Sequence, residues 1–356
     1  MKLSATAHLK YLVAFSLPLT FLVALWLGGP WTFLPLAYAF GCVPLLELLI
    51  NPGESNLDQV EEELRKEDPW YDWLIYMTVP VQFGAVFAFL WILSTQSLQS
   101  YEILGLITAL GVMCGVFGIN VGHELGHRRK PFERYLAQAA LLTSLYTHFF
   151  IEHNRGHHKH VSTEQDPAST RWGETVYGFW LRSVMGGYRS AWSLEQKRLV
   201  NKQLPVLSWQ NQMIRLTVLQ LLWLLAIGLS VGPVVLGYYL LAAVMGFLLL
   251  ETVNYIEHYG LQRQTLASGG YERVQPHHSW NSNHVIGRLL LFELSRHSDH
   301  HYIASRKYQI LRHHDAAPQM PTGYPGMMIL ALISPLWFSV MHPRIQSVQG
   351  PTNRTT

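Results

Sequence analysis

The chain has 356 residues, of which 49% are hydrophobic and only 14% are charged, and its formal net charge is +3. A soluble globular protein usually carries about 25% charged residues, so this deficit indicates a membrane protein. The small net charge and the lack of any basic run argue against a nucleic-acid-binding protein. The two cysteines, Cys42 and Cys114, both lie in apolar stretches, so we expect neither a CxxC redox centre nor a disulfide framework.

Six apolar stretches are candidate membrane spans, since a helix needs about 20 residues to cross a bilayer. In chain order they cover residues 11–27, 33–50, 73–93, 103–121, 216–229 and 234–253. Lysine and arginine residues lie before the first stretch, between the second and third, and after the fourth, whereas the loops 28–31 and 94–100 contain none. The positive-inside rule therefore predicts that both termini lie in the cytoplasm.

Two polar blocks, residues 122–214 and 254–343, are predicted to form a cytoplasmic helical cap. The second block contains a short apolar run, 327–341, which Pro335 interrupts, and we interpret it as an interfacial or packed helix. Residues 344–356 are predicted to be a disordered tail or linker. The expected fold is thus all-α: one polytopic membrane domain over residues 1–343, with six transmembrane helices and a cap.

Histidine is the compositional outlier, because fourteen of the eighteen histidines fall between residues 123–160 and 258–301. Many of them form three boxes: HELGH from 123, HNRGHH from 153 and HSDHH from 297. Residues three or four apart lie on one face of a helix, so each box is expected to present its imidazoles to one point. A fourth element, NYIEHYG from 254, places His258 at the cytoplasmic end of the last span.

Nine histidines are therefore candidate metal ligands, enough for two metal ions with open positions. They are His123, His127, His153, His157, His158, His258, His297, His300 and His301. Imidazole binds iron, copper, zinc and nickel, so the ligand type does not by itself select the metal. A direct role is less clear for His160, His277, His278 and His284, and none is expected for His8, His148, His313, His314 and His342.

Several polar residues lie in or beside these motifs and are candidate partners of the ligating rings. They are Glu124, Glu152, Asp166, Asn254, Glu257 and Asp299. A metal-bound histidine usually donates its other ring N–H to a carboxylate or carbonyl. The alternative is that these acids cap helices or pair with Arg128 or Arg155.

The motifs resemble those of the integral-membrane alkane monooxygenases, a branch of the membrane fatty-acid desaturase/hydroxylase superfamily. That superfamily has three histidine boxes, and the branch adds an Asn-x-x-Glu-His-Tyr-Gly element and a third box Arg-His-Ser-Asp-His-His, which residues 254–260 and 296–301 match. The similarity extends from the first predicted helix to about Met328. Two departures are Arg128-Arg129, where a lysine is expected, and Ser295, where glutamine is common.

This resemblance implies that the nine histidines bind two non-haem irons. It also implies O2-dependent hydroxylation of medium-chain n-alkanes to primary alcohols, in a bacterial-type inner membrane. The electrons would come from rubredoxin, which an NAD(P)H-dependent rubredoxin reductase reduces. We expect the alkane to lie among the transmembrane helices, where Phe40 and Leu45 are candidates for limiting its length. A basic face at Arg128, Arg129, Lys130 and Arg155 either docks rubredoxin or only satisfies the positive-inside rule.

Other functions remain open at this stage. A xylene-type side-chain hydroxylase or a fatty acyl desaturase or hydroxylase would use the same irons. HELGH also fits the HExxH signature of a zinc protease with Glu124 as its base, but that function leaves the other boxes unexplained. A metal transporter or store is a further alternative, although transporter sites tend to lie near the middle of the bilayer.

Overall fold

The computed structural model describes residues 5–349, and the regular elements in that range are all helices. Two isolated β-bridges, Thr265 with Tyr271 and Asn281 with Gln319, are the strand-like pairings found there. The prediction of an all-α fold is confirmed.

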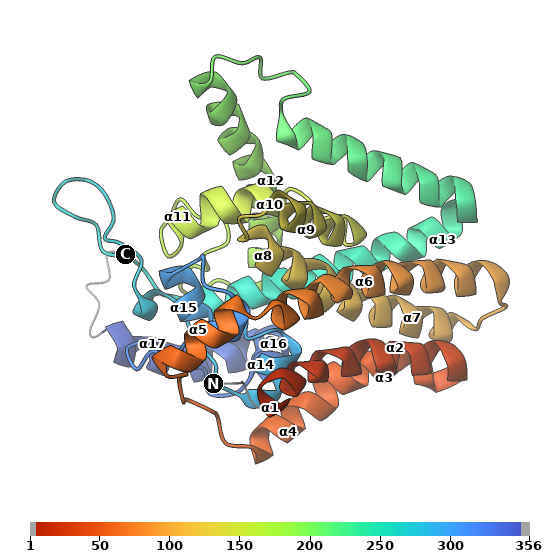
Figure 1. Ribbon diagram of the computed structural model, residues 1–356, viewed down its shortest axis with the longest axis horizontal. Coiled ribbons are helices and arrows are strands. Elements are labelled where there is room, and N and C mark those ends of the chain that lie inside the picture. Colours follow the sequence, from red (N-terminus) through yellow and green to blue (C-terminus); the bar gives the residue numbers. More distant parts are fainter. Residues whose placement is uncertain (1–4, 350–356) are drawn as a thin grey trace.

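The first two apolar segments form a helical hairpin (Figure 1). The first comprises α1 (Ala5–Leu9), the 3-10 segment η1 (Lys10–Phe15) and α2 (Ser16–Leu27). The second comprises η2 (Gly29–Phe33), α3 (Leu34–Ala37), the π-helical segment η3 (Tyr38–Cys42) and α4 (Val43–Leu49). The turn uses Gly28 and Gly29 at φ values of 61° and 54°, which glycine adopts without steric cost.

The next segments begin with the short amphipathic helix α5 (Gln59–Glu67) and continue into the long apolar helix α6 (Pro69–Thr95). Asp68 caps α6, because its side chain accepts a hydrogen bond from the backbone N–H of Trp70. The fourth apolar segment comprises α7 (Ser100–Met113), the π-helical segment η4 (Cys114–Asn120) and α8 (Val121–Gly126).

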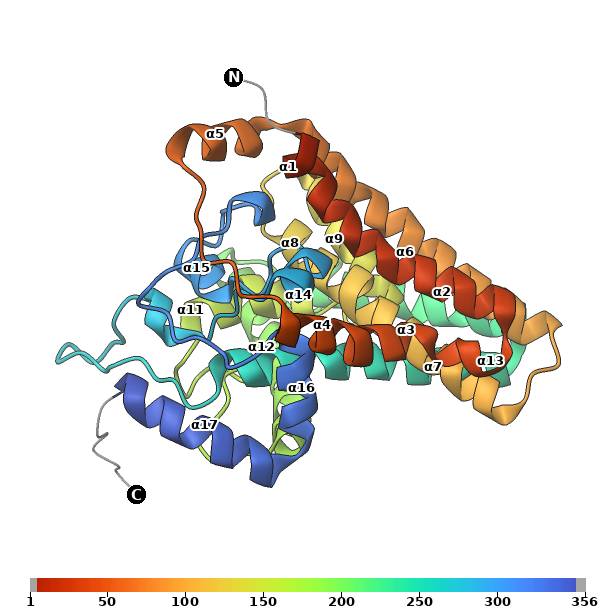
Figure 2. The ribbon, with the colours of Figure 1, turned by 90° about the horizontal axis from the view of Figure 1, so that it is seen from below.

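The last two predicted spans belong to α13 (Gln212–His258), which is bent at Gly232. Gly232 has φ 81° and ψ 170°, outside the helical region, and Pro233 follows it. Figures 1 and 2 show the two limbs of α13 meeting at the far end of the bundle. Five helices are long and apolar enough to cross a membrane, and α13 is the fifth, so six crossings remain a prediction that depends on each limb crossing once.

The polar elements gather at the opposite end of the bundle from the turn between α2 and α3 (Figure 2). They are α9 (Pro131–Thr143), α10 (Phe149–Glu152), the π-helical segment η5 (His153–His157), α11 (His158–His160), α12 (Val176–Asn201), η6 (Pro276–His278), α14 (Val285–Leu290), α15 (His297–Tyr302) and η7 (Tyr308–Ile310). Each is short except α9 and α12, so packing against the bundle must supply most of their stability.

The C-terminal segment forms a bent pair of helices, α16 (Tyr324–Leu332) and α17 (Ser334–Gln349). This agrees with the packed, broken helix expected around Pro335. The predicted disordered tail is wrong for residues 344–349, because Ile345 is only 1% exposed and packs in a core cluster with Tyr259 and Trp337. Residues 350–356 lie outside the described part of the chain.

The outer faces of the apolar helices carry large exposed hydrophobic side chains. Trp26, Leu49 and Leu229 are each at least 80% exposed. Such a surface is unstable in water and is suited to contact with lipid tails. The chain is therefore a multi-pass membrane protein.

Candidate metal centre

The nine candidate histidines meet where the spanning helices reach the polar end of the structure. Four segments supply them: α8 with the residue after it, η5 with α11, the end of α13, and α15. They form two adjacent groups. The five-histidine group is His123, His127, His153, His158 and His300, and the four-histidine group is His157, His258, His297 and His301.

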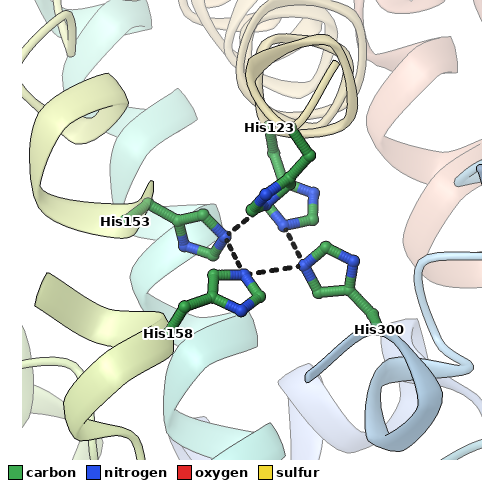
Figure 3. A group of neighbouring side chains, drawn as sticks. His123, His153, His158 and His300 are labelled. Atoms are coloured by element: carbon green, nitrogen blue, oxygen red, sulfur yellow. Dashed lines mark hydrogen bonds between the residues drawn. The ribbon is translucent and has the colours of Figure 1, made fainter. Parts of the chain in front are cut away.

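The rings of the five-histidine group point toward one another, as Figure 3 shows for His123, His153, His158 and His300. The Nε2 atoms of His123 and His300 are 2.9 Å apart, and those of His127 and His153 are 3.0 Å apart. His158 completes the group, because its Nε2 lies 3.0 Å from that of His153 and 3.1 Å from that of His300.

These contacts cannot all be hydrogen bonds, whichever tautomers the rings adopt. The Nε2 atoms of His153, His158 and His300 each approach two other nitrogens, but a neutral imidazole nitrogen has either one hydrogen or one lone pair. Nitrogens at right angles around a shared cation, each ~2.1 Å from it, would be ~3.0 Å apart. The donor set and its spacing therefore fit a bound metal ion.

In the four-histidine group the Nε2 atoms also approach one another closely. The Nε2 atoms of His157 and His301 are 3.1 Å apart, and those of His258 and His297 are 3.2 Å apart. The two groups adjoin, because the ring centroids of His158 and His301 are only 4.5 Å apart. The arrangement therefore has room for two neighbouring metal ions.

The second and third boxes divide their histidines between the groups, which corrects the expectation that each box presents its rings to one point. In η5 the helix is widened to π geometry, which brings residues five apart onto one side. His153 and His158 therefore face the same group, while His157 faces the other. In α15, His297 and His301 are four apart and share a group, and His300 joins the five-histidine group.

Burial favours the uncharged form of most ligand rings. It lowers the pKa of His153 and His300 well below the usual value for histidine, and the nearby rings add to this effect. His157 is the exception, because burial is outweighed there by the charge of Asp166, which raises the pKa of that ring. For His158, burial and the charge of His157 lower the pKa to about 3. Neutral imidazoles keep a lone pair available for a metal. His127 and His158 are also the least buried members of the five-histidine group, so this side of the site is open to the surroundings.

Asp166 supports the ring of His157 from behind. Its Oδ2 lies 2.8 Å from Nδ1 of His157, and Ser169 donates a hydrogen bond to the same oxygen. Burial alone would raise the pKa of Asp166, but the His157 ring and these hydrogen bonds outweigh it and hold the pKa below its usual value. An ionised Asp166 fixes the Nδ1–H tautomer of His157 and leaves Nε2 free to bind metal.

Glu257 approaches the four-histidine group from the side where a metal would lie. Its Oε2 is 3.1 Å from Nε2 of His297, the same nitrogen that faces His258. Tyr324 donates a hydrogen bond of 2.5 Å to the other oxygen, Oε1. Glu257 was expected to orient a ring from behind, and this position also allows it to bind the metal directly.

The other predicted partners do not contact the ligand rings. Glu124 pairs with Arg128 at 2.7 Å and accepts a hydrogen bond from the backbone of Tyr308, which leaves it poorly placed to act as the base of a zinc protease. Asp299 pairs with Arg306 and His314, each at 2.6 Å. These carboxylates hold the polar segments together instead.

Glu152 and Asn254 line a small cavity to which His153 also contributes. Glu251 lies there too, and it accepts hydrogen bonds from Tyr146, Ser183 and Asn254. Burial, followed by the charge of Asp166, raises the pKa of Glu152 to about 8. Sequence reasoning missed Glu251, although an acid inside a long apolar run was a sufficient signal.

The remaining histidines lie outside the two groups. His277 and His278 lie near Glu272, but the backbone N–H of Gln275 donates to Nδ1 of His278. Its Nε2 must then carry the hydrogen that points to Glu272, so His278 is not arranged to bind metal there. His160 and His284 are partly exposed and belong to neither group, and the five histidines expected to have no ligand role do not join them either.

An apolar cavity of about 80 Å³ lies between the helices beside the histidines, and Phe40 is part of its wall. A second, more open apolar cavity of about 490 Å³ shares Phe40, Leu249 and Met328 with the first. Leu45, in contrast, is 64% exposed on the outer face of α4, so it is not a cavity residue. One helical face must meet lipid, and Leu45 lies on that face.

Only two of the four residues in the predicted basic face are exposed cations, because the other two form ion pairs. Arg128 is 8% exposed and forms ion pairs with Asp72 and Glu124, and Arg155 pairs with Glu195. Arg129 and Lys130 are exposed.

Comparison with known proteins defines the class. Residues 100–331 match the fatty acid desaturase family model, and the chain belongs to this family. It is 41% identical over 335 residues to an alkane 1-monooxygenase of Pseudomonas putida, which covers 92% of this chain and 83% of that protein. It is also 41% identical to alkane 1-monooxygenase 1 of Alcanivorax borkumensis, over 91% of this chain and 80% of that protein. These relatives indicate that the chain is an oxidoreductase.

A more distant relative is named for a different class of substrate. The hydroxylase component of a xylene/toluene monooxygenase from Pseudomonas putida is 28% identical, over 90% of this chain and 84% of that protein.

Proposed function

We propose that the chain is an alkane 1-monooxygenase that converts the terminal methyl group of a medium-chain n-alkane to a primary alcohol. The observation that carries this proposal is the pair of adjacent imidazole groups, which together present nine nitrogen ligands. Relatives at 41% identity with that name support it. Two bound irons would activate O2 at this place, since imidazole ligands with open positions suit iron oxygenases.

The chain's own residues hold, orient and shield the site. The nine histidines would bind the irons, with Asp166 fixing the tautomer of His157 and Glu257 contacting His297. Most of these side chains are less than 6% exposed, which keeps bulk water away from the reacting groups.

We place the alkane in the apolar cavity beside Phe40. Three of its lining residues, Asn120, Val253 and Leu294, lie three to five positions before His123, His258 and His297. This end of the cavity is therefore about one helical turn along the chain from the ligands, while Phe40 lies in the second apolar segment. The adjoining open cavity offers an entry from the lipid, where alkanes dissolve.

We further propose that the metal-bearing end and both termini face the cytoplasm of a bacterial cell, with the helices in its inner membrane. Electrons from rubredoxin, itself reduced by an NAD(P)H-dependent rubredoxin reductase, would enter near His127 and His158, the half-buried ligands. The exposed cations Arg129, Lys130 and Lys159 lie close to these two histidines in the chain and suit an acidic partner.

Purified protein in lipid nanodiscs tests the function. We expect about two irons per chain and O2-dependent formation of 1-octanol from n-octane when reduced rubredoxin is supplied. His300→Ala is expected to lose iron and at least about 100-fold in turnover, whereas His313→Ala, outside both groups, is the matched control. Protein that contains no iron but remains fully active would refute the proposal.

The xylene-type alternative rests on the 28% relative. Parallel assays with n-octane, a xylene and a fatty acyl substrate distinguish it. Faster oxidation of the xylene methyl group than of octane would favour the aromatic substrate over the alkane.

A further inference from the structure

The apolar cavity below the histidines contains one polar side-chain atom without a hydrogen-bond partner. Three of the lining residues, Tyr38, Asn120 and Tyr324, carry polar side-chain groups. The Tyr38 hydroxyl lies 2.6 Å from Oγ of Ser16, and Tyr324 donates to Glu257. Asn120 donates from Nδ2 to the backbone oxygen of Leu291 at 3.0 Å, but its Oδ1 receives no hydrogen bond from the described residues.

The orientation of this amide follows from its one contact. The group that faces the Leu291 carbonyl must be the NH2, since a carbonyl only accepts, so the oxygen is the unpaired atom. Asn120 is 6% exposed and borders the cavity. Oδ1 has no partner among the described residues and belongs to a largely apolar cavity wall, so it is available to a ligand that can donate a hydrogen bond.

Asn120 also lies at the metal end of the cavity. It precedes His123 by three residues, about one helical turn, on the segment formed by η4 and α8. The carbon of a substrate that reacts at the metal centre must therefore pass close to this amide.

We propose that Oδ1 of Asn120 binds the hydroxyl group of a primary aliphatic alcohol held in the cavity. This proposal rests on the proposed function, since that alcohol is its product. An n-alkane has no hydrogen-bond donor, so its binding gains nothing from Asn120. The new hydroxyl group gains one hydrogen bond, so the site holds product more tightly than substrate and Asn120 slows product release.

The test compares the binding of n-octane and 1-octanol to the resting holoenzyme in nanodiscs, without reductant. Each compound is supplied at fixed vapour activity, and gas chromatography measures the excess in protein-loaded over empty nanodiscs. The nearly isosteric Asn120→Leu variant is expected to weaken 1-octanol binding relative to octane binding by about 3- to 10-fold, the value of one hydrogen bond. Tyr38→Phe is the matched control, because the hydroxyl it removes from the same cavity is already paired with Ser16.

A ligand series on the unmodified protein provides a second measurement that does not depend on folding of a variant. We expect 1-octanol to bind more tightly than 1-chlorooctane, which has a polar end but no donor, after correction for partition into empty nanodiscs. Equal binding of these two compounds, or an unchanged ratio of 1-octanol to octane binding in the Asn120→Leu variant, would overturn the assignment and leave the proposed function intact. Absence of saturable binding of both octane and 1-octanol would count against the proposed function as well.

Discussion

Asp166 is the residue whose contact with a ligand ring is best defined. It lies nine positions after His157 and contacts Nδ1 of that ring. Asp166→Asn is expected to lower iron retention and turnover by about 10- to 100-fold, because an amide can donate to Nδ1 and then stabilises the wrong tautomer. Metal analysis by mass spectrometry together with octane turnover measures the effect.

Asp315→Asn is the matched control for that experiment, since Asp315 is a fully exposed carboxylate beside His313, a histidine outside both groups. Unchanged iron content in the Asp166→Asn protein would show that the ring needs no carboxylate.

Phe40 is expected to limit the length of the alkane, because it lies in the wall that the inner cavity and the open one share. Phe40→Ala joins the two spaces and should raise the ratio of hexadecane to octane hydroxylation about tenfold, the usual value of such a change in an apolar pocket. Leu45→Ala is the control, since Leu45 faces outward. A product profile of Phe40→Ala that matches the unmodified enzyme would remove Phe40 from the substrate path.

The π-helical segment η5 explains how one short motif contributes to both histidine groups. An α-helix would place residues five apart on different faces, but the Nε2 atoms of His153 and His158 are 3.0 Å apart. The spacing of the second box therefore predicted a ligand motif, and only the backbone geometry assigned each histidine to its group.

Ile345 is one of the buried side chains through which α17 packs beside the end of α13. Ile345 is 1% exposed and lies against the backbone of Gly260, two residues after His258. Ile345→Ala is expected to lower the free energy of unfolding by about 2–5 kcal/mol, through lost burial and the cavity that remains. Chemical denaturation in detergent micelles, followed by circular dichroism, measures this change.

Val348→Ala on the same helix is the control, since Val348 is 41% exposed and its loss should change stability by less than about 0.5 kcal/mol. Equal stability of the two variants would mean that burial of Ile345 contributes little to the fold.

At the scale of the whole molecule, the two histidine groups connect segments that are far apart in the chain, from His123 to His301. A metal bound only by the folded state stabilises it, so removal of iron should lower the unfolding temperature by several degrees. Differential scanning calorimetry before and after anaerobic chelation tests this, with re-addition of Fe²⁺ as the control. An unchanged unfolding temperature would contradict selective binding of the metal by the folded protein.

The same buried rings predict the acid sensitivity of the metal-free protein. Burial and the charge of His157 lower the pKa of His158 to about 3, whereas an unfolded chain takes up that proton at about pH 6.5. The unfolded state then binds more protons, so stability falls as the pH decreases from about 6.5 toward 3, by ~1.4 kcal/mol per pH unit for one such histidine. Denaturation midpoints at pH 7.5 and pH 5.5 measure the slope, which should be shallower in His158→Phe but unchanged in His313→Ala. A slope in His158→Phe as steep as that of the unmodified protein would contradict this origin.

The sequence by itself determined the properties that depend on local composition and spacing. Long apolar stretches predicted the membrane helices, and three boxes with helical spacing predicted imidazole ligands. Both features depend only on residues that are close together in the chain, so they can be read from the sequence. The all-α fold and the membrane location followed from these features, and the resemblance of the boxes to a known family implied the oxidoreductase class.

Tertiary structure alone decided which residues meet. It divided the nine histidines into groups of five and four, turned Leu45 toward the outside and buried Arg128 between two acids. It also ordered residues 344–349 by burying Ile345, and placed Asn120 and Tyr324 beside the site. These outcomes depend on contacts between segments distant in the chain, and no local pattern of residues encodes such contacts.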